Sequence, residues 1–280
     1  MSVGWRGAPP PALAPAGLAG RLRIALRAPV AALWLALMVG AFLLVRGLDR
    51  ARRAITLRDG AALAPFVVQA WALGALRILG LRLDRRGTPM RHPGVIVANH
   101  ASWLDIVVLM RATRVFFVSK AEVEGWPAIG WIARTIGTIF IERRPAEARR
   151  QTEALRRRLR RGDRLCLFPE GTSTDGRRVL PFKSALFAVL YDPELAGALW
   201  VQPVSLVYRP PAGQPPEFYA WWGDMDFGAH LLAVLARPGG GRVEVIFHPP
   251  LRPAASPDRK ALAEAAAAAV RAGHGSGRAA

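Results

Sequence analysis

The chain has 280 residues, enough for one large domain and an appendage. Its single cysteine, Cys166, excludes an intramolecular disulfide and fits a reducing compartment. The formal net charge of +19 favours an anionic partner such as a membrane surface or a phosphorylated substrate. Nucleic acid is less favoured and we expect none as a partner, because the chain contains no recognised nucleic-acid module.

Two apolar segments follow a stretch rich in Pro, Ala and Gly over residues 1–20. Residues 28–45 carry no charge and are flanked by arginines. A bilayer core needs about 20 apolar residues, so this segment fits a spanning helix, a re-entrant hairpin, an interfacial helix or a buried soluble helix. Residues 61–80 are also apolar, and the two segments together predict a helical pair that dips into the membrane. We therefore assign residues 1–84 to an N-terminal tail and membrane-associating helices, with a boundary at the turn over 85–89.

Strand-like and helix-like patterns alternate from residue 95 onward, which predicts an α/β domain over residues 85–280. The expected fold is a mixed sheet flanked by helices. We expect strands at residues 95–98, 115–119, 137–141, 164–168, 199–207 and 242–248. We expect helices at residues 103–111, 127–135, 146–161, 182–191 and 257–272. The tail from Gly273 to Gly277 is expected to be disordered.

A histidine and an aspartate follow the first of these strands, in Asn99-His100-Ala101-Ser102-Trp103-Leu104-Asp105. Chemistry in α/β sheets often lies on such loops, because rigid elements hold them on both sides. His100 can act as a base near neutral pH, and the carboxylate of Asp105 can fix its tautomer. A purely structural alternative is a helix capping box over Ser102 and Asp105, with His100 only hydrogen-bonded in the loop.

Three more motifs follow in a set order. They are Phe140-Ile141-Glu142-Arg143, then Phe168-Pro169-Glu170-Gly171-Thr172-Ser173, and then the proline-bearing strand Val201-Gln202-Pro203-Val204-Ser205-Leu206. With the His100 and Asp105 motif, this order resembles the glycerolipid acyltransferase family, whose best-known members are bacterial 1-acylglycerol-3-phosphate acyltransferases. The resemblance covers about residues 85–210, and the first and third motifs together make it specific.

The resemblance implies an O-acyltransferase that moves a fatty acyl group from an acyl thioester to the free hydroxyl of a lysolipid. The donor would be acyl-CoA or acyl carrier protein. His100 would take the proton from the hydroxyl, and Asp105 would orient the imidazole. The substrate hydroxyl is then the nucleophile, so the reaction needs no metal or other cofactor. The expected substrate-binding residues are Asn99, Lys120, Arg143, Glu170, Gly171, Thr172, Ser173 and Pro203.

Individual roles follow from side-chain chemistry and from the family pattern. Arg143 is expected to bind an anionic head group in a bidentate way, with Lys120 as a second cation; ordinary surface charges are the alternative for both. Gly171 would let the acceptor approach the backbone closely, and Glu170 would position neighbouring groups. Pro203 would shape the pocket through its fixed φ.

One departure from the family pattern bears on the acceptor. Many members carry an arginine directly after Glu-Gly-Thr, where this chain has Ser173. We expect 1-acyl-sn-glycerol-3-phosphate as the acceptor, in phospholipid biosynthesis, with lyso-ornithine lipid as the alternative. Alternatives of other classes are a thioesterase, with water as the acceptor, and a catalytically dead basic membrane-binding protein. The intact His100, Asp105 and Glu170 argue against a dead site.

The helix expected at 146–161 carries seven arginines, which form either a solvated face or a contact with anionic lipid. The basic charge and the apolar segments together predict a membrane-associated protein. We expect it at the cytoplasmic face of a bacterial inner membrane.

Two further stretches suggest sites more weakly. Asp224, Asp226 and His230 have the residue types of a metal site, but their spacing is weak evidence and we expect no metal. Trp221 and Trp222 fit core or acyl-pocket packing somewhat better than an aromatic anchor at the membrane interface.

Overall fold

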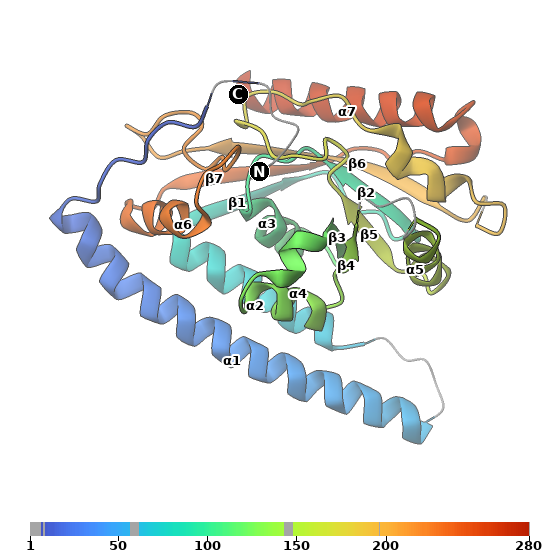
Figure 1. The fold of residues 1–280 in the computed structure, drawn as a ribbon, viewed down its shortest axis with the longest axis horizontal. Coiled ribbons are helices and arrows are strands. Elements are labelled where there is room, and N and C mark those ends of the chain that lie inside the picture. The colour runs from blue at the N-terminus through green and yellow to red at the C-terminus, as the bar shows by residue number, and fades with distance from the viewer. Residues whose placement is uncertain (1–6, 8, 57–61, 143–147, 196, 280) are drawn as a thin grey trace.

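The computed structural model describes residues 7, 9–56, 62–142, 148–195 and 197–279. A seven-stranded sheet in the order β1-β7-β6-β2-β5-β3-β4 forms the centre of the molecule, with helices on both faces (Figure 1). The strands are β1 Leu81–Arg86, β2 Gly94–Ala98, β3 Phe116–Lys120, β4 Ile139–Ile141, β5 Arg164–Leu167, β6 Trp200–Arg209 and β7 Gly241–Phe247. The β6–β7 pair is antiparallel and the other pairs are parallel, so the predicted mixed α/β sheet is confirmed.

The helices form two layers around this sheet. They are α1 Leu18–Thr56, α2 Ala64–Leu79, α3 Leu104–Ala112, α4 Ile129–Thr135, α5 Ala148–Arg160, α6 Phe227–Ala236 and α7 Arg259–Ala279, with 3-10 turns η1 Ala121–Gly125, η3 Ser184–Tyr191 and η4 Pro253–Ala255. One apolar core joins α2, α3 and α6 to one face of the sheet, and a second joins α7 and η3 to the other. In Figure 1, α7 lies above the sheet and α1 runs below α2.

The central strand β2 explains why the predicted strands were easy to locate. All five of its residues are buried, because Ile96 and Ala98 face one core while Val95 and Val97 face the other. A strand covered on both faces has a continuous apolar sequence instead of an alternating one. Such runs predicted β2 to β7 within about two residues of their observed ends.

The edge strand β1 was not predicted. Only Leu81 and Leu83 of its six residues belong to the apolar core, and four of the six are charged. Charged side chains suit an edge strand, because they oppose pairing with another chain. The sheet thus begins at Leu81, before the expected boundary at residues 84 and 85, and that division into domains stays a prediction.

The C-terminal tail was predicted wrongly, because Gly273 and Gly277 lie inside α7. A Cβ at Gly273 would lie 2.4 Å from Ser205 Oγ, and one at Gly277 would lie 2.8 Å from a methyl group of Val207. The glycines therefore let α7 lie directly on β6, and this packing stabilises a helix that local propensity disfavours. Two other predictions were incomplete: α6 was missed, and residues 184–191 form 3-10 turns instead of an α-helix.

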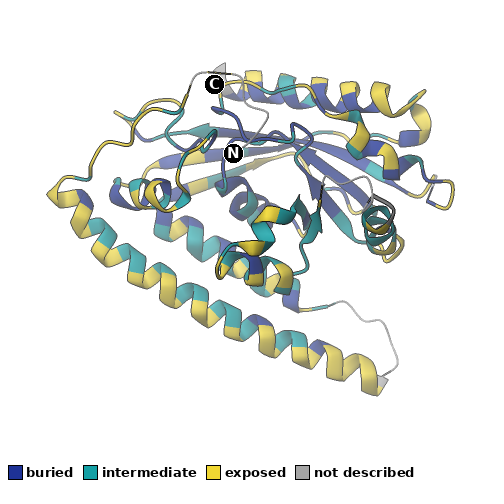
Figure 2. Cartoon of the chain, viewed as in Figure 1, coloured by how far each residue is buried: buried dark blue, intermediate teal, exposed yellow. Residues whose placement is uncertain are grey.

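Helix α1 contains the first apolar segment and lies along the domain. Arg27 donates to Arg237 O at 2.7 Å, Trp34 Nε1 donates to Trp71 O at 3.0 Å, and Asp49 Oδ2 accepts the N–H of Leu63 at 2.8 Å. Among the described helices, it is the one with the length and apolarity to cross a membrane. Its outward face is exposed (Figure 2) and carries Leu18, Leu22, Leu26, Val30, Leu33, Leu37, Leu44 and Leu48.

Candidate active site

His100 and Asp105 meet at the carboxyl end of β2, as the motif predicted. His100 Nδ1 lies 2.8 Å from Asp105 Oδ2, and the imidazole stacks on the ring of Phe168 with centroids 4.1 Å apart. An ionised carboxylate only accepts hydrogen bonds, so it favours the tautomer with the proton on Nδ1. The His100 side chain is 20% exposed, and its Nε2 is then a free acceptor for a substrate proton.

Asp105 is fully buried and accepts four hydrogen bonds. Besides His100, its Oδ2 accepts the backbone N–H groups of Ala101 at 2.8 Å and Ser102 at 3.0 Å. Its Oδ1 accepts the hydroxyl of Tyr208 at 2.7 Å. Donors on both oxygens hold the carboxylate in one orientation and offset its burial.

The capping alternative describes part of the same geometry. Asp105 accepts the N–H of Ser102, and Ser102 Oγ accepts the N–H of Leu104 at 3.3 Å, so both side chains bind backbone groups at the start of α3. The same carboxylate oxygen also binds His100. One residue therefore stabilises the helix start and orients the imidazole, and the two interpretations are compatible.

Tyr208 is a site residue that the sequence analysis missed. It lies near the end of β6, on the face that also carries Val204 and Leu206. Burial, and next the negative charge of Asp105, raise the pKa of its phenol well above the usual value. The hydroxyl therefore stays protonated and donates to Asp105. The alternation of β6 was the one signal that could have placed Tyr208 toward α3.

Glu170 joins two segments that are remote in sequence. Its Oε1 accepts the N–H of His100 at 2.6 Å, and its Oε2 accepts the N–H of Leu180 at 2.7 Å. Burial raises the pKa of this carboxyl group to about 8, although the two N–H groups act in the opposite direction. Both oxygens bind backbone groups, so Glu170 holds the loop that carries His100 against the loop after β5.

The rest of the loop after β5 packs closely against the His100 loop. Thr174 donates its N–H to His100 O at 2.9 Å, and the side chains of Thr172 and Ser173 are buried. Gly171 has φ 72°, in the region that favours glycine. A Cβ on Gly171 would lie 2.5 Å from Lys183 Nζ, so the lysine side chain occupies the space over this glycine.

The other predicted binding residues lie in different surroundings. Asn99 Nδ2 donates to Leu206 O at 3.0 Å, and Asn99 Oδ1 accepts the N–H of Leu206 at 2.8 Å. These two hydrogen bonds extend the pairing of β2 with β6. Pro203 is buried in β6 beside Val97. Lys120 ends β3 and is partly exposed. Arg143 lies outside the described residues.

The histidine of the proposed metal motif is engaged by hydrogen bonds. His230 Nδ1 accepts from Trp103 Nε1 at 2.9 Å, its Nε2 lies 3.3 Å from Phe218 O, and burial lowers the pKa of its imidazole. Asp226 caps α6 by accepting the N–H of Ala229 at 2.7 Å. The described part of the chain contains no group of three His, Cys, Asp or Glu side chains that could hold a metal ion.

The two neighbouring tryptophans of this stretch differ in burial. Trp222 is buried, whereas Trp221 is half-buried and makes edge contacts with Trp126 and Phe227. Both tryptophans thus take part in packing within the fold.

Several arginines of α5 make ion pairs within the fold. Arg156 pairs with Asp192, and Arg160 pairs with Glu194. Arg158 lies 2.7 Å from Asp163 and stacks on Phe116 at 3.8 Å from the ring centroid. These pairs favour a structural role for that part of the helix over lipid contact.

Comparisons with known proteins identify the family by sequence and show the fold by structure. A family model described as Acyltransferase matches residues 82–207. The chain is 47% identical over 271 residues to a lyso-ornithine lipid O-acyltransferase of Rhodobacter capsulatus, covering 97% of each protein. It is 38% identical over 153 residues to a 1-acyl-sn-glycerol-3-phosphate acyltransferase of Neisseria gonorrhoeae, covering 52% of this chain and 57% of that protein. The crystal structure of the 1-acyl-sn-glycerophosphate acyltransferase PlsC from Thermotoga maritima shares the fold, with a TM-score of 0.61 at 19% identity over 93% of this chain and 98% of that one.

Proposed function

Since the chain belongs to the acyltransferase family, we propose that it is a membrane-associated O-acyltransferase that esterifies the free hydroxyl of lyso-ornithine lipid. The family expected from the motif order is confirmed, and so is lysolipid O-acylation as its reaction. The observation that carries the mechanism is the His100–Asp105 pair, in which Nδ1 faces the carboxylate and the side chain is partly exposed.

The acceptor is proposed from the extent of similarity. The R. capsulatus protein aligns over 97% of both chains, including the N-terminal helices. The N. gonorrhoeae protein, named for a phosphate acceptor, aligns over 52% of this chain. Ser173 also stands where many members of the family carry an arginine. We therefore rank lyso-ornithine lipid first and 1-acyl-sn-glycerol-3-phosphate second, which reverses the order expected from the sequence.

In the proposed mechanism, His100 Nε2 takes the proton of the acceptor hydroxyl as its oxygen attacks the thioester carbonyl carbon. The C–O bond forms and a tetrahedral intermediate appears. When the intermediate collapses, the C–S bond breaks and the imidazolium returns its proton to the leaving thiolate. Asp105 stabilises the imidazolium throughout, and no acyl-enzyme forms.

Four residues act on the reaction through their neighbours. Tyr208 holds the Asp105 carboxylate, and Glu170 holds the backbone of His100. Asn99 and Pro203 set how β2 and β6 meet beneath the site. They are positioning residues in this proposal, although the family pattern groups Asn99, Glu170 and Pro203 with the substrate-binding residues.

Substrate binding is assigned to residues around this centre. Arg143 and Lys120 would bind the carboxylate of the acceptor head group, because guanidinium and ammonium groups both pair with anionic oxygens. Thr172 and Ser173 would form the wall behind the acceptor, whereas Gly171 leaves room for the Lys183 side chain.

Membrane association is proposed to place α1 in the interface. This helix is ~58 Å long, whereas the hydrocarbon core is ~30 Å thick. Arg27, Trp34 and Asp49 hold it along the domain, so the exposed leucines can enter one leaflet while the domain stays outside. The donor, acyl-CoA or acyl carrier protein, would reach the site from the cytoplasm.

The test is a comparison of acceptors with the full-length protein in vesicles and one acyl-CoA. We expect kcat/KM for lyso-ornithine lipid to exceed that for 1-acyl-sn-glycerol-3-phosphate. The reverse order would favour the second acceptor and leave the reaction unchanged. If the thioester is cleaved equally fast with and without an acceptor, the protein is a thioesterase, and both acceptor assignments are overturned.

Arg143→Ala tests the head-group assignment. It should mainly raise KM for the acceptor if Arg143 binds the ground and transition states alike. Arg177→Ala is the matched control, since it removes an exposed arginine from the loop after β5. Equal effects of both variants would contradict a specific contact by Arg143.

A further inference from the structure

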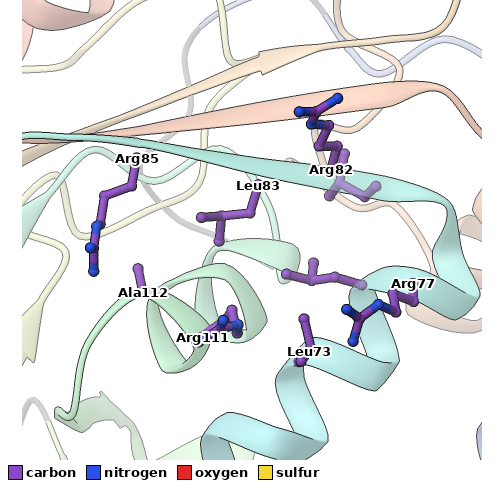
Figure 3. A pocket seen from close by; sticks show the side chains of 9 residues that line it. Leu73, Arg77, Arg82, Leu83, Arg85, Arg111 and Ala112 are labelled. Atoms are coloured by element: carbon purple, nitrogen blue, oxygen red, sulfur yellow. The ribbon is translucent and has the colours of Figure 1, made fainter.

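A pocket lies away from His100, between the edge strand β1 and helices α2 and α3 (Figure 3). Its volume is about 400 Å³, within the range of pockets that hold small molecules. Leucines and Ala112 form an apolar floor with Arg77, Arg85 and Arg111 around it, whereas the Arg82 side chain extends from the other face of β1. The lining residues are Leu73, Leu76, Arg77, Leu81, Arg82, Leu83, Arg85, Arg111 and Ala112.

The pocket carries positive charge that the fold leaves largely uncompensated. Asp84 lies 3.5 Å from Arg82 and 4.0 Å from Arg242. Among the residues that the structure describes, no carboxylate forms an ion pair with Arg77, Arg85 or Arg111. Guanidinium groups gathered in this way repel each other unless an anion lies between them, and they match the oxygens of a phosphate.

The position of the pocket indicates where the anion comes from. Phe66, Leu73 and Arg77 share one face of α2, because they are seven and four residues apart. Phe66 is 52% exposed, and Arg114 stacks on its ring at 5.1 Å. Helix α2 packs against α1, whose outer leucines are exposed. The pocket thus borders α2, which packs directly against the helix that is proposed to enter the membrane interface.

The pocket is also separate from the catalytic centre. Strands β7 and β6 lie between β1 and β2, a lateral distance of ~14 Å at the usual strand spacing. None of the lining residues takes part in the hydrogen bonds described above for the side chains of His100 and Asp105.

We propose that this pocket binds the head group of an anionic membrane phospholipid. The phosphate lies among Arg77, Arg85 and Arg111, and the first methylenes of the acyl chains lie on Leu73 and Leu83. Diffuse attraction between a basic protein and an anionic surface would need no pocket. If a lipid binds in the pocket, membrane binding and the orientation of the enzyme depend on these particular arginines and on the shape of the pocket.

The test measures co-sedimentation of the full-length protein with phosphatidylcholine vesicles, with and without one-fifth phosphatidylglycerol. The variant Arg77→Gln/Arg111→Gln should weaken binding to the anionic vesicles by roughly 30-fold. It should leave binding to phosphatidylcholine alone unchanged. The control Arg157→Gln/Arg161→Gln removes two exposed arginines in and just after α5 and should have less than one-third of that effect. Equal losses of binding in both double variants would show that only the overall positive charge attracts the protein to the vesicles, and would overturn the proposal.

A third variant tests the shape of the pocket. Leu73→Trp fills it without changing the charge and should also reduce the preference for anionic vesicles several-fold. Leu232→Trp, at an exposed position on α6, is its control. Inorganic phosphate, compared with chloride at equal ionic strength, tests for a soluble ligand. Release of the protein by millimolar phosphate, or full binding by Leu73→Trp, would contradict a lipid in the pocket.

These assays contain no acyl donor or lysolipid. Their outcome is therefore independent of the proposed acceptor. Thermal unfolding of each variant checks that the fold is kept.

Discussion

Replacing Asp105 with Asn would remove the charge beside His100 and keep the shape of the side chain. The structure predicts how the amide would turn. Oδ2 of Asp105 accepts the N–H groups of Ala101 and Ser102, so the Asn oxygen should take that place. The amide nitrogen would then face Tyr208, whose hydroxyl can accept as well as donate. His100 would keep its proton on Nδ1, and the reactive tautomer would survive.

The expected loss is therefore the loss of charge alone. A carboxylate and an imidazolium whose charges lie ~4 Å apart attract by ~4 kcal/mol at an effective dielectric constant of about 20. The difference between a charged and a neutral hydrogen bond sets a lower limit of ~1 kcal/mol. At about 1.4 kcal/mol per tenfold change in rate, kcat should fall by roughly 5- to 700-fold. A variant with the wrong tautomer would lose about 10⁴-fold.

The assay is kcat for lysolipid acylation in vesicles, with urea unfolding measured in parallel. The double variant Asp105→Asn/Tyr208→Phe deprives the amide of its acceptor and should unfold with ~1–3 kcal/mol less free energy than Asp105→Asn. Asp105→Ala is the control, since it leaves the N–H groups of Ala101 and Ser102 unpaired. A folded Asp105→Asn protein with a 10⁴-fold loss, or a double variant as stable as the single one, would refute this reasoning.

Three further predictions concern single contacts. Tyr208→Phe removes one hydrogen bond to a buried carboxylate and should lower the free energy of unfolding in urea by ~1.5–3 kcal/mol, with less than a tenfold loss of kcat/KM; unchanged stability would contradict the contact. Burial raises the pKa of Glu170 from 4.5 to about 8, so its contribution to stability is present below the unfolded value and is lost as pH rises through 8. Between pH 4.5 and about 8, the free energy of unfolding should fall by up to ~1.4 kcal/mol per pH unit, and Glu170→Gln should abolish this slope. Equal slopes for the wild-type protein and Glu170→Gln would contradict the raised pKa of Glu170. Leu33→Gln/Leu37→Gln on the exposed face of α1 should reduce partition into neutral vesicles by roughly 10-fold or more, measured by flotation, and unchanged partition would exclude insertion of that face.

The limits of sequence prediction for the fold follow from where residues are buried. Strands covered on both faces, such as β2, have apolar sequences that identify them without tertiary information. Strand β1 has the sequence Leu81-Arg82-Leu83-Asp84-Arg85-Arg86, and its strand state depends on pairing with β7, more than 150 residues away. Gly273 and Gly277 favour a loop locally, and only the surface of β6 explains why they are helical.

The site divides in the same way. His100 and Asp105 were predictable, because one loop supplies both residues and their spacing brings the side chains together. Tyr208 was not, because its contact with Asp105 spans 103 residues and β6 contains no motif around it. Glu170 was predicted to be important, but its two backbone partners could not be known before the loops were placed. The space over Gly171 was expected to admit the acceptor, and the distant Lys183 occupies it.

The central claim is that His100 activates the acceptor hydroxyl for direct attack on the thioester. The most direct measurement is the initial rate of lysolipid acylation by His100→Ala, compared with the wild-type protein at saturating acyl-CoA, with the fold verified by thermal unfolding. The account predicts a rate lower by about 10²–10⁴, the range for a lost general base. A folded His100→Ala protein that acylates at a near-normal rate would contradict it.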